Sequence, residues 1–327
     1  MADTSSLSLD LTFLTDTGAE LKFQTPLSEF TTFRLGGLCP CVITCRTPDQ
    51  LLSVIKKLPS KNIDYVLFGG GSNLLVSDEG LDCVVIRFVR ETPIIELKGH
   101  DILVSGSTAL DQLVAFAVGH GLEGINYCSG IPGTVGGAIV GNAGAFGNQV
   151  GDVLKTVVLA DHKGNTREAK PESLGFRYRH SDLKETEDIV VSAVFQADTG
   201  NKEQLSKERE EILALRHSKH PDLNIEPSAG SFFRNIEPTS KAEKRQAAGW
   251  FLEQAGAKEL RVGGARIFEK HANIIVKDSG CKAQDVFELS KLMAQAAKKH
   301  FDLTLVREVR LVGKFQGMPT EVTRVMW

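Results

Sequence analysis

Two glycine-rich segments are the part of the sequence best suited to holding a ligand for chemistry. The longer one, GIPGTVGGAIVGNAGAFG, spans residues 130–147, and the shorter one, GGGSN, spans residues 69–73. Glycine lets a backbone turn tightly or approach another molecule closely. Successive N–H groups without neighbouring Cβ atoms can point together at an anion, and a pyrophosphate is commonly held in this way. The segments therefore indicate a large anionic ligand, with a set of buried turns as the alternative.

The same residues disfavour the two commonest nucleotide-binding motifs. A Rossmann fingerprint needs G-x-G-x-x-G at the start of a helix. Here Leu74 stands at the sixth position, and the apolar residues on either side predict strands at 65–68 and 74–76. A Walker loop does not fit either, because neither segment contains Gly-Lys followed by Ser or Thr.

The six cysteines do not form a recognisable metal or disulfide pattern. Cys39, Cys41 and Cys45 are the only cluster, and there is no C-x-x-C motif or His pair to complete a metal site. In a reducing compartment the cysteines remain thiols, which usually behave as small buried hydrophobes. We therefore expect no metal centre.

Composition excludes several classes of protein. The chain has 327 residues and a net charge of −3, which disfavours binding to nucleic acid or to an anionic membrane through a basic surface. No apolar stretch approaches eighteen residues, and the first six residues lack the basic start and apolar core of a signal peptide. We expect a cytoplasmic protein with two or three domains, without membrane insertion.

The elements that position the glycine segments are predicted from capping residues and apolar periodicity. After a polar, frayed N-terminus we expect a strand at 41–45, then a helix capped by Thr47 with Pro48 in its first turn. The 130–147 segment is expected to be a loop. Further strands are predicted at 102–104, 157–160, 189–195 and 303–311, and helices at 110–118, 202–215, 242–255 and 283–299. Because strands and helices mix without a strict β-α repeat, the fold class is α+β, and the chain changes domain near the 202–215 helix.

Eight short blocks resemble one family in one order. They are TTFRLGG (31–37), GGGSN (69–73), GIPGTVGG (130–137), NAG (142–144), YR (178–179), AGSFFRN (229–235), KHAN (270–273) and EVR (308–310). Together they resemble the UDP-N-acetylmuramate dehydrogenase family, also called UDP-N-acetylenolpyruvoylglucosamine reductase or MurB. The resemblance extends from about Thr31 to Gly313.

The resemblance implies a flavoenzyme of peptidoglycan precursor synthesis. NADPH would reduce non-covalently bound FAD, which would then reduce UDP-N-acetylglucosamine enolpyruvate to UDP-N-acetylmuramate. The implied organisation is an N-terminal extension (1–28), a two-lobed PCMH-type FAD-binding domain (29–200), a C-terminal α+β substrate-binding domain (201–313) and a tail (314–327). The implied partners are the UDP-sugar and NADPH, and we expect a monomer.

The resemblance also implies roles for individual residues. Arg179 and Glu308 would polarise the substrate carboxylate and its enolate, and Ser231 would donate a proton to the neighbouring carbon. Tyr178, Arg234 and Asn235 would contact the substrate. The implied FAD contacts are Arg34, Gly69, Gly70, Gly71, Ser72, Asn73, Gly130, Gly133, Thr134, Gly136, Gly137, Asn142, Ala143 and Gly144.

Ordinary structural roles are the alternative for the three implied catalytic residues. Arg179 could belong to a surface basic cluster, Ser231 to a turn, and Glu308 to a surface ion pair. Departures from the family pattern occur at Asn126, Ile236, Phe268 and Lys277, and the short 179–231 interval is typical of the subtype without a tyrosine-bearing lid.

Two other functions remain open at this point. One is another PCMH-type FAD-dependent oxidase, although neither glycine segment contains a His or Cys to tether flavin, and Cys128 lies just outside. The other is a non-catalytic module that senses UDP-sugars, which would have no need of the acid Ser231.

Overall fold

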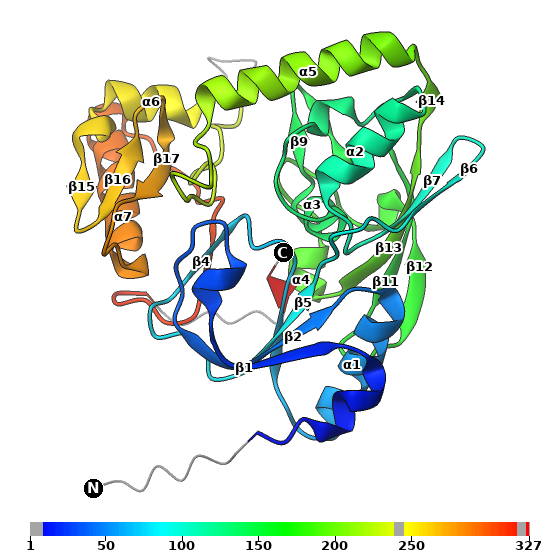
Figure 1. The fold of residues 1–327 in the computed structure, drawn as a ribbon. Helices are drawn as coiled ribbons and strands as arrows, with labels where there is room; N and C mark the ends of the chain where they lie inside the picture. The colour runs from blue at the N-terminus through cyan, green and yellow to red at the C-terminus, as the bar shows by residue number, and fades with distance from the viewer. Residues whose placement is uncertain (1–8, 239–244, 319–324, 327) are drawn as a thin grey trace, which may run out of the picture.

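The computed structural model describes residues 9–238, 245–318 and 325–326. The described residues form two five-stranded sheets and a smaller C-terminal sheet. Figure 1 shows the long helix α5 running along one side of the molecule between the second sheet and the C-terminal part. The α-helices among the described residues are α1 (Pro48–Ser60), α2 (Leu110–Gly119), α3 (Val135–Gly141), α4 (Leu183–Thr186), α5 (Lys202–Lys219), α6 (Ala248–Gln254) and α7 (Ala283–Phe301). None of the described helices is long and apolar enough to cross a membrane.

The first sheet has the order β1-β2-β5-β3-β19. Its strands are β1 (Glu20–Pro26), β2 (Leu38–Cys45), β5 (Val84–Phe88), β3 (Tyr65–Phe68) and β19 (Val325–Met326). β1 is antiparallel to β2, whereas the other neighbours are parallel. Helix α1 connects β2 to β3 and begins as predicted, because the Thr47 hydroxyl accepts a hydrogen bond from the backbone N–H of Gln50.

The second sheet is antiparallel and has the order β12-β11-β13-β7-β6. Its strands are β6 (Ile95–Lys98), β7 (Asp101–Ser105), β11 (Leu154–Ala160), β12 (Thr166–Ala169) and β13 (Ile189–Gln196). Side chains of both sheets and of helices α1 to α3 share one apolar core, which includes Ile43, Ile55, Leu113 and Val157. This common core fixes the position of one sheet relative to the other.

The C-terminal part is a three-stranded sheet packed against α6 and α7. Its strands are β15 (Arg261–Val262), β16 (Ala265–Phe268) and β17 (His271–Lys277), in sequential antiparallel order. Its core also takes in Phe33, Leu35 and Leu75 from the N-terminal part. Strand β18 (Arg310–Val312) then pairs in parallel with β4 (Leu74–Val76), so a late segment of the chain returns to the residues after the GGGSN segment.

Short elements complete the described chain. The two-stranded pairs are β8 (Leu122–Glu123) with β14 (Asp198–Thr199), and β9 (Gly144–Ala145) with β10 (Asn148–Gln149). The 3₁₀ helices are Thr12–Thr17, Leu27–Phe30, Asn126–Cys128, Val150–Asp152, Pro171–Ser173 and Ala257–Glu259.

Four expectations about local structure are wrong. The described N-terminal residues are folded rather than frayed, because Leu11 and Leu14 are buried and β1 pairs with β2, and residues 1–8 lie outside the described residues. The 130–147 segment is not all loop, since residues Val135–Gly141 form α3, capped by Thr134. The helix expected at 242–255 begins at Ala248 within the described residues, and residues 242–244 lie outside them. The strand expected at 303–311 is limited to Arg310–Val312, apart from an isolated bridge between Phe233 and Arg307.

Candidate active site

The two glycine-rich segments meet across a cleft. The hydroxyl of Ser72 donates a hydrogen bond to the carbonyl of Pro132 over 3.0 Å. A Cβ atom at Gly70 would lie 3.0 Å from the Cα of Gly133, closer than carbon atoms normally pack. Gly71 has a φ of +65°, and a Cβ there would meet the carbonyl oxygen of Phe30. Glycine at position 70 is therefore required for the close approach of the two segments, and glycine at position 71 is required for the turn of the shorter segment against Phe30.

The cleft has a volume of about 440 Å³ and is lined by residues from all three parts of the fold. Of the predicted FAD contacts it brings together Gly69, Gly70, Gly71, Ser72, Asn73, Gly133, Thr134, Gly137, Ala143 and Gly144. It also brings together the three predicted catalytic residues, Arg179, Ser231 and Glu308, and the predicted substrate contact Asn235.

Six predicted site residues are not part of this lining: Arg34, Gly130, Gly136, Asn142, Tyr178 and Arg234. Several of them form hydrogen bonds with other parts of the protein. The amide of Asn142 donates to Gln149 and to the carbonyl of Arg177, and its oxygen accepts from the N–H of Gly151. The N–H of Gly130 donates to Asp111, and the Arg34 guanidinium donates to the carbonyl of Asn224. Their predicted contacts with FAD remain predictions.

The predicted catalytic residues come from three separate segments. Arg179 precedes α4, Ser231 forms a bridge with Ile274 of β17, and Glu308 precedes β18. The N–H of Glu308 donates to the carbonyl of Phe232, next to Ser231, over 2.8 Å. The carbonyl of Glu308 accepts from the Asn73 amide over 3.2 Å. One backbone hydrogen bond and one from the Asn73 side chain thus hold the Glu308 backbone between the serine and the GGGSN segment.

Arg179 and Glu308 form an ion pair inside the cleft. Arg179 Nε lies 2.9 Å from Glu308 Oε1, although its N–H is not aligned well enough to count as a hydrogen bond. Burial raises the pKa of Glu308, while the positive charges of Arg179, Lys184 and Arg234 act in the opposite direction. Because burial is the larger effect, the site favours a Glu308 carboxyl that can hold a proton near a cation.

The predicted substrate contacts lie beside this pair. Arg245 stacks over the ring of Tyr178 at 3.8 Å from its centroid, and Arg179 lies 5.5 Å from the same ring. The Asn235 oxygen accepts from the N–H of Ala248, where α6 begins. Arg234 Nε is buried without a hydrogen-bond partner among the described residues, which leaves a donor able to meet an anionic group.

Sequence reasoning missed the three further residues of the lining that have titratable side chains: Arg216, His220 and His271. The two imidazole rings lie 5.8 Å apart, and His271 Nδ1 accepts from the N–H of Asn273 over 3.2 Å. Burial lowers the pKa of His220 to about 4. His271 belongs to the KHAN block, which was the one signal that could have found it. Arg216 lies in α5 and His220 is its C-cap residue, and neither belongs to a sequence block that resembles the family.

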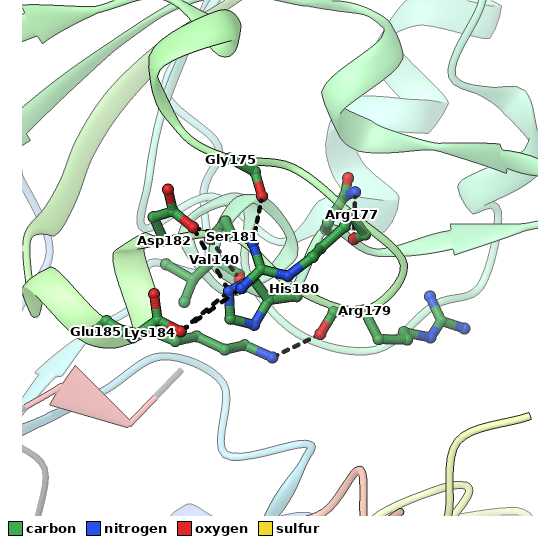
Figure 2. Close-up of polar contacts among 10 residues, drawn as sticks. Val140, Gly175, Arg177, Arg179, His180, Ser181, Asp182, Lys184 and Glu185 are labelled. Carbon is green, nitrogen blue, oxygen red and sulfur yellow. Dashed lines mark hydrogen bonds and ion pairs between the residues drawn. The ribbon is translucent and has the colours of Figure 1, made fainter. Parts of the chain in front are cut away.

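Two features bear on alternative chemistry: Cys128 as a covalent flavin tether, and the cluster of His180, Asp182 and Glu185 as a metal site. Cys128 is fully buried, and burial raises the pKa of its thiol to about 12, so it is poorly suited to forming a covalent tether. His180, Asp182 and Glu185 have ligand-type atoms within 4.8 Å of one another. Figure 2 shows the Arg177 guanidinium among them. It lies 3.2 Å from Asp182 and 3.8 Å from Glu185, so a cation already faces these acids.

Comparisons with known proteins agree with the organisation of the cleft. Residues 39–170 match the model of an FAD binding domain, and residues 220–312 match that of the UDP-N-acetylenolpyruvoylglucosamine reductase C-terminal domain. These matches confirm the expected fold class, in which a PCMH-type FAD-binding part precedes a C-terminal α+β part.

Whole-chain relatives carry the same name. The chain is 33% identical to UDP-N-acetylenolpyruvoylglucosamine reductase of Lactobacillus acidophilus, over 94% of this chain and 99% of the relative. It is 37% identical to that of Pelobacter propionicus, over 88% and 94%. The crystal structure of UDP-N-acetylenolpyruvylglucosamine reductase (MurB) from Thermus caldophilus matches with a TM-score of 0.72 at 32% identity, covering 90% of this chain and 98% of that one. With identity sustained over nearly the full length of these relatives, the chain belongs to the UDP-N-acetylenolpyruvoylglucosamine reductase family.

Proposed function

We propose that this protein reduces UDP-N-acetylglucosamine enolpyruvate to UDP-N-acetylmuramate, with FAD as its cofactor and NADPH as the reductant. The observation that carries the proposal is the cleft itself, where Arg179, Ser231 and Glu308 face the two glycine-rich segments. A module that only sensed UDP-sugars would not need a proton donor beside a carboxyl and a guanidinium. The product is a precursor of peptidoglycan.

The residues present fit a bound FAD. The glycine-rich segments approach so closely that a Cβ at Gly70 or Gly133 would fill the space between them. Because these positions have no side chain, their backbone N–H groups are accessible to a pyrophosphate. The cleft-lining members of the 69–73 and 130–144 segments would hold the cofactor non-covalently. When bound and reduced, FAD supplies the hydride that the enolpyruvyl group accepts.

The chain's own residues handle the charge and the proton. Hydride addition to the terminal carbon pushes negative charge into the substrate carboxylate, and Arg179 stabilises that charge electrostatically. A protonated Glu308 donates a hydrogen bond to the same group, whereas an ionised Glu308 would instead be paired with Arg179, whose positive charge offsets the repulsion. The Ser231 hydroxyl then gives its proton to the adjacent carbon, which completes the lactyl ether. A hydroxyl can do this because the enolate of a carboxylate is strongly basic.

Substrate binding involves the remaining predicted contacts. The buried, unpartnered Nε of Arg234 suits a phosphate oxygen, and Asn235 offers a neutral polar edge. Tyr178, flanked by Arg179 and Arg245, adds an aromatic face. Asn235 lines the cleft, whereas Arg234 and Tyr178 are not part of that lining.

The organisation expected from the sequence supports this proposal. An FAD-binding domain at 29–200 and a substrate-binding domain at 201–313 contain the two matched spans. The 180–230 interval holds α4, β13, β14 and α5, which suits the subtype without a tyrosine-bearing lid. We further propose a cytoplasmic monomer, in keeping with a soluble substrate and a cleft assembled from one chain.

The decisive experiment separates the two half-reactions in a Ser231→Ala variant. The parent should release FAD into the supernatant on acid precipitation. Reduction of bound FAD by NADPH needs no proton from Ser231, so its rate should stay within a few-fold of the parent. Reoxidation by the enolpyruvyl substrate should slow by at least about 10²-fold, the lower range for a positioned general acid.

Anaerobic stopped-flow absorbance of the flavin measures each half-reaction separately. Equal slowing of both, or of neither, would remove Ser231 from the role of acid and leave Glu308 or a bound water as the donor. Turnover with a simple alcohol and oxygen, at the rate seen with the UDP-sugar, would instead support the oxidase alternative.

A further inference from the structure

Arg179 has a backbone conformation that an arginine rarely adopts. Its φ is +55°, in the left-handed region where a side chain crowds the backbone. Non-glycine residues remain in this region only when their surroundings hold them there, and such residues concentrate at functional sites. The conformation of Arg179 therefore requires contacts that fix it.

Three contacts fix the turn that carries Arg179. Backbone hydrogen bonds run both ways between Arg177 and His180, each 3.0 Å long. The buried hydroxyl of Ser181 donates to the carbonyl of Val140 in α3 over 2.8 Å. Lys184 Nζ donates to the carbonyl of Arg179 itself over 2.8 Å. Figure 2 shows the Lys184 ammonium reaching this carbonyl while the Arg179 guanidinium points away from the group formed by Arg177, Asp182 and Glu185.

We propose that Lys184 is a positioning residue for the reaction, holding the Arg179 carbonyl so that the guanidinium stays beside Glu308. This inference rests on the proposed function, in which the Arg179–Glu308 pair stabilises the developing carboxylate charge. Lys184 itself does not line the cleft and acts through Arg179.

The charges around Lys184 argue against a role in stability alone. Arg179, Arg234 and Arg310 all repel its ammonium, and Glu308 is the one attracting group among those that influence it most. Burial together with the arginines lowers the pKa of Lys184 to about 8. Burying a cation among cations is costly unless it is hydrogen-bonded, and an apolar side chain would avoid that cost. The hydrogen bond from Lys184 to the Arg179 carbonyl is therefore the contact that explains, in functional terms, why a lysine occupies this position.

The test compares Lys184→Met with a matched control, Lys57→Met. Lys57 also donates from its ammonium to a backbone carbonyl, that of Phe13 over 3.1 Å, but on α1 and outside the lining of the cleft. We expect Lys184→Met to slow the substrate half-reaction at least tenfold, with FAD reduction by NADPH within threefold of the parent. Lys57→Met should leave both half-reactions within about twofold. Equal slowing of both half-reactions by Lys184→Met, or none, would overturn the proposal.

A double-mutant cycle tests whether Lys184 acts through Arg179. In an Arg179→Ala background, Lys184→Met should cost less than twofold in the substrate half-reaction, because the group that it positions is gone. A further tenfold loss in that background would show that Lys184 acts independently of Arg179. Lys184→Gln, a shorter neutral donor, serves as the second variant if Lys184→Met folds poorly.

A crystal structure of a Lys184 variant gives a readout independent of the reaction. We expect residue 179 to leave the positive-φ region, or its Nε to move more than about 1 Å farther from Glu308 than in the parent. An unchanged Arg179 would overturn the positioning role even if the protein proved to act on another substrate. Conversely, a displaced Arg179 in a protein that does not turn over the UDP-sugar would overturn only the proposed function.

Discussion

Adding one methyl group at Gly70 tests whether the contact between the glycine segments forms the cofactor site. In Gly70→Ala the new Cβ would lie 3.0 Å from the Cα and 3.5 Å from the carbonyl carbon of Gly133. Ordinary van der Waals contact begins at about 3.4 Å, so the segments must separate by a few tenths of an ångström. Both contacting atoms belong to backbone, and neither can swing aside as a long side chain could.

The expected magnitude follows from overpacking. Inserting a methylene-sized group into a close-packed contact costs about 1–3 kcal/mol, and the free energy of unfolding of the apoprotein should fall by an amount in this range. If the same backbone holds the pyrophosphate, the shift also lengthens those hydrogen bonds, and the Kd for FAD should rise at least about tenfold, or about 1.4 kcal/mol.

Gly119→Ala is the matched control. Gly119 ends helix α2, has no positive φ, and a Cβ there meets no atom within 4 Å. Alanine has a higher helix propensity than glycine, so the free energy of unfolding of this variant should rise by up to about 1 kcal/mol, with unchanged FAD affinity. Denaturant unfolding of the apoproteins and fluorescence titration with FAD give the two quantities. Gly70→Ala with parental stability and parental FAD affinity would refute the assignment of this contact to the cofactor site.

Two further predictions concern titratable groups of the cleft. Glu308→Gln should slow the substrate half-reaction less than Ser231→Ala does, because an amide still donates a hydrogen bond where a protonated carboxyl did. Stopped-flow measurement of flavin reoxidation checks this. An equal or larger loss of rate would mean that the ionised carboxylate is required. For His220, burial and the neighbouring His271 lower the folded-state pKa to about 4, below the unfolded value near 6.5. The stability due to neutral His220 is thus complete above pH 6.5 and is lost as pH falls toward 4. After allowance for solvent screening of a partly exposed ring, the free energy of unfolding should drop by about 1–2 kcal/mol between pH 7.5 and 5, and His220→Asn should remove that drop in denaturation curves at the two pH values. A His220→Asn protein with the parental pH dependence would contradict the pKa shift.

Local signals in the sequence predicted the elements around the shorter glycine segment. The Thr47 cap, the apolar residues 65–68 and the apolar residues 74–76 each correspond to an observed boundary. Strands β3 and β4 are short and buried, so their apolar runs determine them directly, and the capping chemistry of Thr47 determines the start of α1. The meeting of Arg179, Ser231 and Glu308 in one cleft followed from the family resemblance, since no local pattern brings residues so distant in sequence together.

Other elements depend on tertiary context that a single sequence does not display. Strand β1 exposes most of its side chains and is held by pairing with β2, so it lacks the alternation of a half-buried strand. Helix α3 is short and glycine-rich, and burial of Ala138 and Ile139 outweighs its poor helix propensity. Residues 303–305 alternate apolar and polar side chains, yet no partner strand lies beside them among the described residues.

The parallel pairing of β18 with β4 also has a consequence for how the chain folds during synthesis. Residues Leu74–Val76 leave the ribosome long before Arg310–Val312, and β18 is their only strand partner among the described residues. Domains usually fold from the N-terminus as they emerge, but here the edge of the cofactor cleft must wait for nearly the whole chain. Protease sensitivity of residues 74–76 in chains arrested before residue 310 is the direct measure of this delay. The edge of the cleft is therefore among the first parts of the enzyme to be synthesised and among the last to be completed.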